Sequence, residues 1–403
     1  MKFKSLENRI IFILTFIHFI HLVDFVVIMP LGPTLMAKLG VSPATFAALV
    51  SAYTFAGAAT GLIISLFADK FEKKLLLTLS LLGVAIGTAF CGLAQNGYQL
   101  IIARALTGFF GGVLNPLVFA LVAEWIPASR RGKAMAWVMS GFSMASVIGV
   151  PIGLVINDYF GHEMTFFSIS FLIALTSIGC YFLLPESSIP SQELKFKELV
   201  KVLGTSLKNK KYLKVFFYTF FISGTMFLLI PMLSPYAVKN MGMQTTDLKF
   251  MYLIGGLLTV VTARIFGVLT DRFGGQHVYM GLCLASVFPV YLYTHSGPIY
   301  FYQYIAIGAV FMSLISGRMI PAMTLTSLVP APHQRGQFMG ILNSVRAGST
   351  ALGSLIVGLI VVENNQGKLI NFDKIGKTAI AVSLISIILT YLIFDTNDSK
   401  EQE

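Results

Sequence analysis

Charged residues are scarce in this chain of 403 residues. Aspartate, glutamate, lysine and arginine together make up 12% of it, whereas hydrophobic residues make up 56%. A soluble domain has about 25% charged residues, because water must solvate its surface. The shortage therefore argues against a soluble domain and indicates that most of the outer surface faces lipid.

Cysteine and histidine are also rare, with three and six residues respectively. Cys91, Cys180 and Cys283 are isolated along the chain, and no pair of them has the spacing of a metal site. The sequence contains neither an H-E-x-x-H zinc helix nor a G-x-S-x-G nucleophile elbow. These absences argue against an intramembrane enzyme, and we expect neither a metal site nor a cofactor.

The hydrophobic residues are present as twelve blocks, each long enough to cross a hydrocarbon core of about 30 Å. The alternation typical of a membrane β-barrel is absent, so each block is predicted to be a transmembrane helix with internal backbone hydrogen bonds. The expected fold is an all-α membrane protein with two pseudo-symmetric six-helix bundles. The blocks are 10–36, 44–68, 75–95, 98–126, 132–158, 163–184, 212–238, 247–270, 275–294, 297–328, 336–362 and 376–394.

The net charge of +11 could suggest a nucleic-acid partner, but the positions of the basic residues favour another interpretation. Most lysines and arginines fall in alternate connecting segments, which the positive-inside rule places in the cytoplasm. Both termini are therefore predicted to be cytoplasmic, in a multi-pass protein of the inner (plasma) membrane. The first block is too long for a cleaved signal peptide and is predicted to remain as the first helix.

A polar stretch, 185–211, is the one long interruption between hydrophobic blocks. Apolar residues within it recur at helical spacing with lysines on the other face, which predicts a cytoplasmic linker with an amphipathic helix on the cytoplasmic surface of the membrane. This linker divides the chain into an N-terminal bundle, 1–184, and a C-terminal bundle, 212–403. We expect lipid to be the partner of this surface, and no nucleic acid.

The two halves repeat the same features in the same order. Internal duplication of this kind is typical of transporters in which one half moves against the other. The matched positions include Asp69 with Asp271, Gly112 with Gly317, Pro116 with Pro321, Arg131 with Arg335, and Gly149 with Gly353.

Three motifs resemble those of the major facilitator superfamily. Residues 65–74 and 267–274 resemble its loop 2–3 signature, although Ser65 and Glu72 stand where glycines are usual. The segment that begins at Arg104 resembles its helix 4 motif. The run Gly149-Val-Pro151-Ile-Gly153 resembles the helix 5 motif of its drug:proton antiporter and sugar-efflux-like branch, in which small residues let helices approach closely.

The resemblance implies a monomeric secondary active transporter that moves a small organic molecule by alternating access. It favours proton-coupled efflux, that is, antiport; coupled or facilitated uptake of a metabolite stays open, as does a channel or receptor-like protein. The resemblance also implies a latch at the cytoplasmic gate, formed by Asp69, Lys73, Glu124 and Arg131 in the first half and by Asp271 and Arg272 in the second.

Ionisable residues form a stripe in the first predicted helix. His18, His21 and Asp24 are spaced i, i+3 and i+6, and Asp24 is the single acidic residue deep within any block. An intramembrane carboxylate is a functional hypothesis by default, so these residues and Arg104 are the candidates for proton coupling. Three alternatives stay open. Asp24 is a structural partner of Arg346 or of a helix backbone, the stripe forms a metal site, or the Arg104 side chain extends to the membrane surface.

Further polar residues lie within the predicted helices. In the resembled family, helices 1, 4, 7 and 10 line the central path, which implies that Asn115 and Arg318 face it. The candidates for the substrate cavity are Tyr53, Asn115, Arg318, Asn343 and Arg346.

Overall fold

The computed structural model describes residues 5–67, 71–187, 204, 206, 208–330 and 335–394, nearly all of them helical. The amphipathic helix predicted in the linker lies outside these residues. The elements of the N-terminal half are α1 (Ser5–Val27), α2 (Gly32–Leu39), α3 (Pro43–Phe67), α4 (Lys73–Leu93), α5 (Gly97–Trp125), α6 (Ala128–Met144), the π-helical turn η2 (Ala145–Gly149), α7 (Val150–Phe160) and α8 (His162–Leu183).

The C-terminal half repeats this plan and adds a small hairpin. Strands β1 (Val362–Glu363) and β2 (Leu369–Ile370) pair antiparallel, and Asn240 exchanges two hydrogen bonds with the backbone of Leu369. The helices are α10 (Lys210–Lys239), the short η3 (Thr245–Asp247), α11 (Leu248–Phe273), α12 (Gly275–His295), α13 (Phe301–Gly317), α14 (Met319–Ser327), α15 (Arg335–Ile360) and α16 (Phe372–Phe394).

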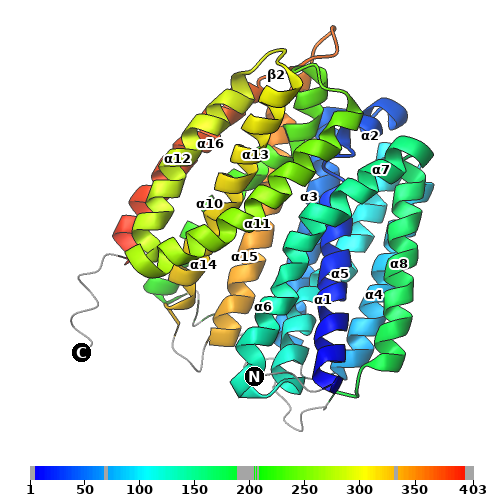
Figure 1. Ribbon diagram of the computed structural model, residues 1–403, viewed down its shortest axis with the longest axis vertical. Helices are drawn as coiled ribbons and strands as arrows, with labels where there is room; N and C mark the ends of the chain where they lie inside the picture. The colour runs from blue at the N-terminus through cyan, green and yellow to red at the C-terminus, as the bar shows by residue number, and fades with distance from the viewer. Residues whose placement is uncertain are drawn as a thin grey trace.

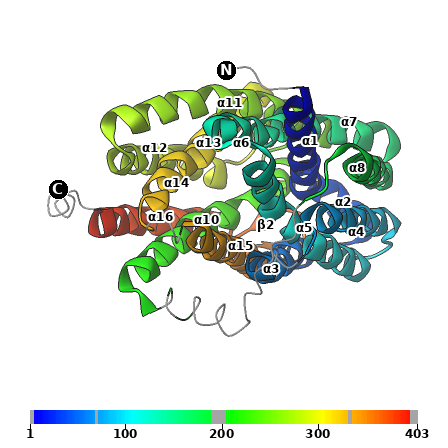
Figure 2. The ribbon, with the colours of Figure 1, turned by 90° about the horizontal axis from the view of Figure 1, so that it is seen from below.

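The two halves stand side by side with their helices running along one common axis (Figure 1). The first described residue of α1 and the last of α16 lie at one end of the bundle, which we call the termini end, and α2 and the hairpin lie at the opposite, far end. Seen from below, α3 lies beside α15 at the boundary between the halves (Figure 2).

Eleven helical segments among the described residues are long and apolar enough to cross a membrane. Helix α15 is less apolar but has 26 residues, about 39 Å at the rise of an α-helix, and it packs between α3 and α10. The predicted all-α fold is therefore confirmed, with the two-residue strands of the hairpin as a minor addition.

Prolines break two of the predicted helices. The first block divides at Val27 into α1 and α2, because neither Pro30 nor Pro33 has an N–H to donate to the preceding turn. The block 297–328 divides after Gly317, the residue whose carbonyl would meet the ring of Pro321 four residues later. The second break places Arg318 at the junction of α13 and α14.

The halves touch each other at the far end. Lys249 Nζ of α11 lies 2.8 Å from Asp158 Oδ2 of α7, which forms an ion pair between the halves. A Cβ on Gly358 of α15 would lie 3.2 Å from the Cα of Ala44 of α3. Toward the termini end α11 and α12 lean away from the N-terminal half (Figure 1), whereas α15 packs against α3. The described conformation is thus closed at the far end.

Glycines bring α3 and α5 into backbone contact within the N-terminal half. A Cβ on Gly108 would overlap the carbonyl of Tyr53, and one on Gly112 would overlap the carbonyl of Gly57. Helices in lipid gain little from apolar burial, so such close backbone approach supplies much of their attraction.

We expect Gly108→Ala to lower the melting temperature of the purified protein, because backbone atoms of Tyr53 cannot move aside for a methyl group. The expected loss is about 1–3 kcal/mol, the usual cost of overpacking. Gly281→Ala is the matched control, since nothing lies within 4 Å of that position in α12. Equal melting temperatures for the two variants would contradict the packing assigned to α3 and α5.

Candidate functional site

A buried ion pair lies inside the N-terminal half. Asp24 of α1 and Arg104 of α5 are both fully buried, and Nη1 of the arginine lies 3.4 Å from Oδ2 of the carboxylate. Thr88 of α4 donates its hydroxyl to Oδ1 at 2.7 Å. Arg104 also donates to the backbone carbonyl of Asp24 at 3.3 Å, so three helices meet at this one carboxylate.

Aromatic residues complete the surroundings of the pair. The Arg104 guanidinium lies 4.3 Å from the ring centre of Tyr53, close enough for a cation–π interaction. The Tyr53 hydroxyl lies 3.3 Å from Nδ1 of His21. Phe25 stacks on Tyr53 and on Phe227 of α10, at 5.0 and 6.0 Å between ring centres. This stack connects the surroundings of the ion pair to the C-terminal half.

The third member of the predicted stripe has a partner of its own. His18 Nδ1 lies 3.0 Å from Oδ1 of Asn115, which is beside Pro116 in α5. His18, His21 and Asp24 therefore each bond to a different neighbour. No group of three or more His, Cys, Asp or Glu residues that could hold a metal ion occurs in the part of the chain that the structure describes.

Two interpretations left open by the sequence are wrong. Asp24 pairs with Arg104 and not with Arg346, because α1 packs against α5 within its own bundle whereas Arg346 lies on α15 of the other half. Arg104 also does not reach the membrane surface. It is fully buried and points to Asp24, since a neutralising carboxylate stabilises the cation better than a long reach to water.

The C-terminal half holds its own buried arginine at the break between α13 and α14. Arg318 is 3% exposed, and its Nη1 donates to the hydroxyl of Ser383 in α16 at 2.9 Å. The same nitrogen lies 3.9 Å from Sγ of Cys283 in α12. Arg318 therefore binds neutral groups inside its bundle, on the side of α12 and α16.

Asn343 and Arg346, the remaining cavity candidates, are one helical turn apart on α15. The arginine donates from Nη1 to Oδ1 of Asn343 over a long 3.4 Å. Asn343 is exposed and Arg346 is half-buried, beside a small recess between α10 and α14.

The helix 5 motif packs against α1. A Cβ on Gly149 would overlap the side chain of Val23, and one on Gly153 would lie 2.8 Å from Val27. Pro151 cannot donate to the preceding turn, and the chain there adopts the π-helical turn η2 before α7 begins. The motif thus holds α7 close to the segment of α1 that carries Asp24.

The predicted latch is only partly within the described residues. Lys73 Nζ lies 3.3 Å from Oε2 of Glu124, which joins the start of α4 to the end of α5. Within the described residues, Arg131 donates to the carbonyl of Ala123 at 2.6 Å and forms no ion pair with a carboxylate. Asp69 lies outside the described residues, so its role in the latch stays a prediction.

In the second half, Asp271 and Arg272 are both exposed at the last turn of α11. The Arg272 guanidinium lies 5.3 Å from the ring centre of Phe273. Their role as a latch also stays a prediction.

Glu72, which departs from the family signature, has a structural role that sequence reasoning missed. It caps α4 by accepting from the backbone N–H of Leu75 at 2.6 Å, and it accepts from the hydroxyl of Ser187 at 2.7 Å. Partial burial acts to raise the pKa of this carboxyl, but hydrogen bonds from Ser187, Leu75 and Lys74 outweigh it and lower the pKa. Glu72 thereby ties the start of α4 to the chain that follows α8.

The Lys249–Asp158 pair at the far end was also missed. Its members lie 91 positions apart in different halves, and no sequence spacing indicates that they meet. The same holds for Thr88, an unremarkable hydroxyl in the sequence that becomes a partner of Asp24.

Two helical bundles of membrane-spanning length, which bury a carboxylate and two arginines, are typical of a polytopic membrane transporter. The chain belongs to the Major Facilitator Superfamily, whose family model matches residues 14–354.

Several known proteins are similar to this chain. Multidrug resistance protein MdtG of Proteus mirabilis (strain HI4320) is 27% identical over 343 residues, which cover 82% of this chain and 81% of that relative. A solved structure of the nucleoside transporter NupG has a TM-score of 0.76 at 15% identity and covers 97% of this chain and 100% of its own. A bacterial homologue of the human lysosomal transporter Spinster, inward-facing and occupied, has a TM-score of 0.76 at 14% identity, with 99% of both chains covered.

We expect Asp158→Asn to shift the protein toward a conformation open at the far end, because the variant loses the ion pair with Lys249. A partly exposed ion pair contributes about 1 kcal/mol to the stability of the conformation that contains it. Its loss corresponds to a roughly five-fold change in the ratio of the conformations closed and open at the far end. Spin labels at Tyr98→Cys and Tyr300→Cys, exposed at the far end of each half, would report the change as a longer distance.

Asp373→Asn is the control for this measurement. It breaks the exposed Asp373–Lys377 pair, which lies within α16 and does not join the halves. A label distance that responds equally to both variants would show that Asp158 has no specific part in closing the far end.

Proposed function

We propose that the protein is a proton-coupled antiporter that exports a small organic molecule across the inner membrane by alternating access. The observation that carries this proposal is the buried ion pair between Asp24 and Arg104. A carboxylate at this depth is costly to bury, and protonation is the simplest reaction that changes its charge. The ion pair thus provides a site where one proton can be bound and released.

Proton binding would change the contacts among three helices. Without the proton, Asp24 of α1 neutralises Arg104 of α5 and accepts from Thr88 of α4. With the proton, the negative charge is lost, and the ring face of Tyr53 remains beside the guanidinium. The attraction between α1 and α5 is then weaker, so the two states of Asp24 favour different helix positions.

The aromatic stack gives this change a route to the other half. Phe25 follows Asp24 directly in α1 and stacks on Phe227 of α10. A movement of α1 would therefore alter a contact between the halves near the closed far end. Alternating access requires such contacts to break when the far end opens.

The direction of transport is inferred from the relatives. MdtG is named a multidrug resistance protein, and export of organic molecules is what this name favours. Uptake of a metabolite is the alternative, and transport by oriented vesicles distinguishes the two. We also propose that the termini end is cytoplasmic, since most basic residues of the connecting segments lie on that side.

We expect Asp24→Asn to abolish transport driven by a pH gradient while downhill exchange of the same substrate remains. Asparagine keeps the shape of the side chain and can still hydrogen-bond to Thr88, but it cannot bind or release a proton. The measurement uses proteoliposomes and a substrate first identified by thermal shift, since a ligand of the native state stabilises it.

A structural role for Asp24 needs a separate control, because loss of one partner of a buried ion pair costs about 3–5 kcal/mol. The double variant Asp24→Asn with Arg104→Gln removes both charges and should recover much of the stability without recovering pH-driven transport. If pH-driven transport persists in either variant, the coupling proton is carried elsewhere. If stability is lost and recovered together with transport, Asp24 has a structural role alone.

We expect reporter fusions after Lys38, Asn96 and Ser296 to be periplasmic and fusions after Lys74 and Gly274 to be cytoplasmic. The first three sites follow segments that end at the far end, and the last two lie at the termini end. A cytoplasmic signal after Asn96 would reverse the proposed orientation of α4 and α5.

A further inference from the structure

Charge is distributed unequally between the two halves. In the N-terminal half, Arg104 is the one arginine far from the end of a helix, and Asp24 neutralises it. The C-terminal half has Arg264 in α11, Arg346 in α15, and Arg318 at the junction of α13 and α14. All acidic residues between 212 and 394 lie at or near the ends of helices or in the hairpin. These residues are Asp247, Asp271, Glu363 and Asp373.

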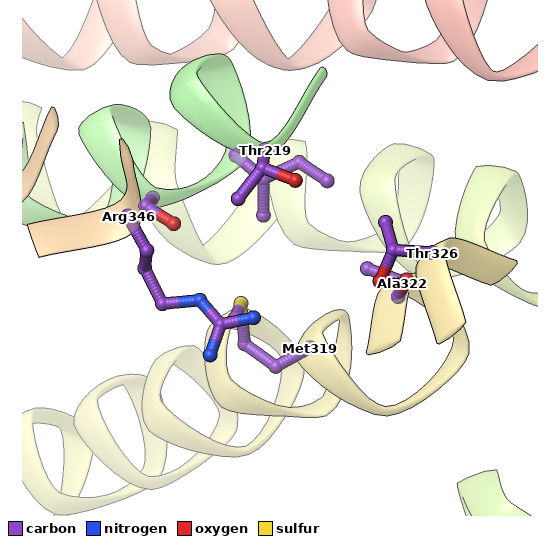
Figure 3. A pocket seen from close by; sticks show the side chains of 7 residues that line it. Thr219, Met319, Ala322, Thr326 and Arg346 are labelled. Carbon is purple, nitrogen blue, oxygen red and sulfur yellow. Dashed lines mark hydrogen bonds between the residues drawn. The ribbon is translucent and has the colours of Figure 1, made fainter. Parts of the chain in front are cut away.

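One of these arginines borders a recess. A cavity of about 10 Å³ lies between α10, α14 and α15, and its walls include Thr219, Ser223, Met319 and Arg346. Figure 3 shows the Arg346 side chain extended from α15 toward Met319, with Thr219 above it. The recess therefore has a guanidinium on one side and hydroxyl groups on another.

Two hydrogen-bond donors that line this recess have no acceptor among the described residues. Ser223 is 3% exposed, and its hydroxyl has no hydrogen-bond partner among the described residues. Nε of Arg346 is also buried without a partner in that part of the chain. The one hydrogen bond given by its Nη1, to Asn343, is long at 3.4 Å. A buried donor without an acceptor destabilises the protein, so a group that accepts here would be bound favourably.

The chemistry of these donors selects the class of that group. A guanidinium can only donate, and a hydroxyl donates readily to a stronger acceptor, so the best partner is an acceptor with negative charge. The described part of the C-terminal half supplies no carboxylate near Arg346, since its acidic residues lie near helix ends. A cavity of this size holds about one water-sized atom. A terminal oxyanion oxygen fits it, while the rest of a ligand would remain outside.

We propose that Arg346, with Ser223 and Thr219, binds the anionic head group of the transported molecule. The substrate class is an organic anion with a terminal oxyanion, such as a carboxylate. The apolar side chains of Ile222 and Met319, which also line the recess, would contact the part of the ligand next to the head group. This proposal rests on the transport function proposed above and specifies its substrate.

The test uses three probes with one skeleton and three charges: phenylbutanoate, phenylbutanamide and phenylbutylammonium. We expect phenylbutanoate to raise the melting temperature of the detergent-purified full-length protein and to bind in calorimetry, at constant ionic strength. The amide and the ammonium compound should bind at least roughly ten-fold more weakly, since they lack the charge-assisted hydrogen bonds.

Variants locate the binding to the recess. Arg346→Gln should weaken phenylbutanoate binding roughly ten-fold or more, Arg346→Lys should weaken it less, and Ser223→Ala should weaken it by about three-fold. Lys374→Gln removes a positive charge from an exposed position at the start of α16, and we expect it to leave binding unchanged. Arg346→Lys also keeps the test usable if Arg346→Gln does not fold.

Either of two results would overturn the proposal. The first is that phenylbutanoate binds no better than the amide, which would mean that the recess holds only water. The second is equal affinity for phenylbutanoate in the native protein, Arg346→Gln and Arg346→Lys. Failure of the transport function is distinguishable from both: phenylbutanoate would then bind through Arg346, but no pH gradient would drive its movement in proteoliposomes.

Discussion

Asp24 and Arg104 are both fully buried, and inside a membrane neither charge is stable without the other. The rest of the N-terminal half is arranged around this requirement. Thr88 supplies a hydrogen bond to the carboxylate and Tyr53 places its ring against the guanidinium. Because these four residues lie on α1, α3, α4 and α5, the pair sets the relative positions of four helices.

Glycine and proline make that arrangement sterically possible. Gly108 and Gly112 let α5 lie against the backbone of α3, which brings Arg104 and Tyr53 together. Gly149 of η2 and Gly153 of α7 bring these two elements against the part of α1 near Asp24. Small residues are thus concentrated where charged side chains need short distances, because bulkier ones would separate the helices.

The two halves share a plan but differ in their charges. The repeated glycines and prolines give them similar helices, yet Pro116 lies within the continuous helix α5 whereas Pro321 follows a break. At that break Arg318 binds the hydroxyl of Ser383 rather than a carboxylate. The two halves therefore differ in how their buried arginines are held, by a carboxylate in the first and by neutral groups in the second.

The sequence by itself determined the helices, the duplication and the family, because hydrophobic blocks of membrane length and the spacing of glycine and proline are local signals. It also identified Asp24 and Arg104 separately, since charges are rare within such blocks. Only the tertiary structure decided that these two residues pair, that Thr88 joins them, and that Lys249 meets Asp158. Those contacts depend on which faces of the helices meet and on how the two halves are placed. The sequence spacing between residues far apart in the chain does not indicate either arrangement.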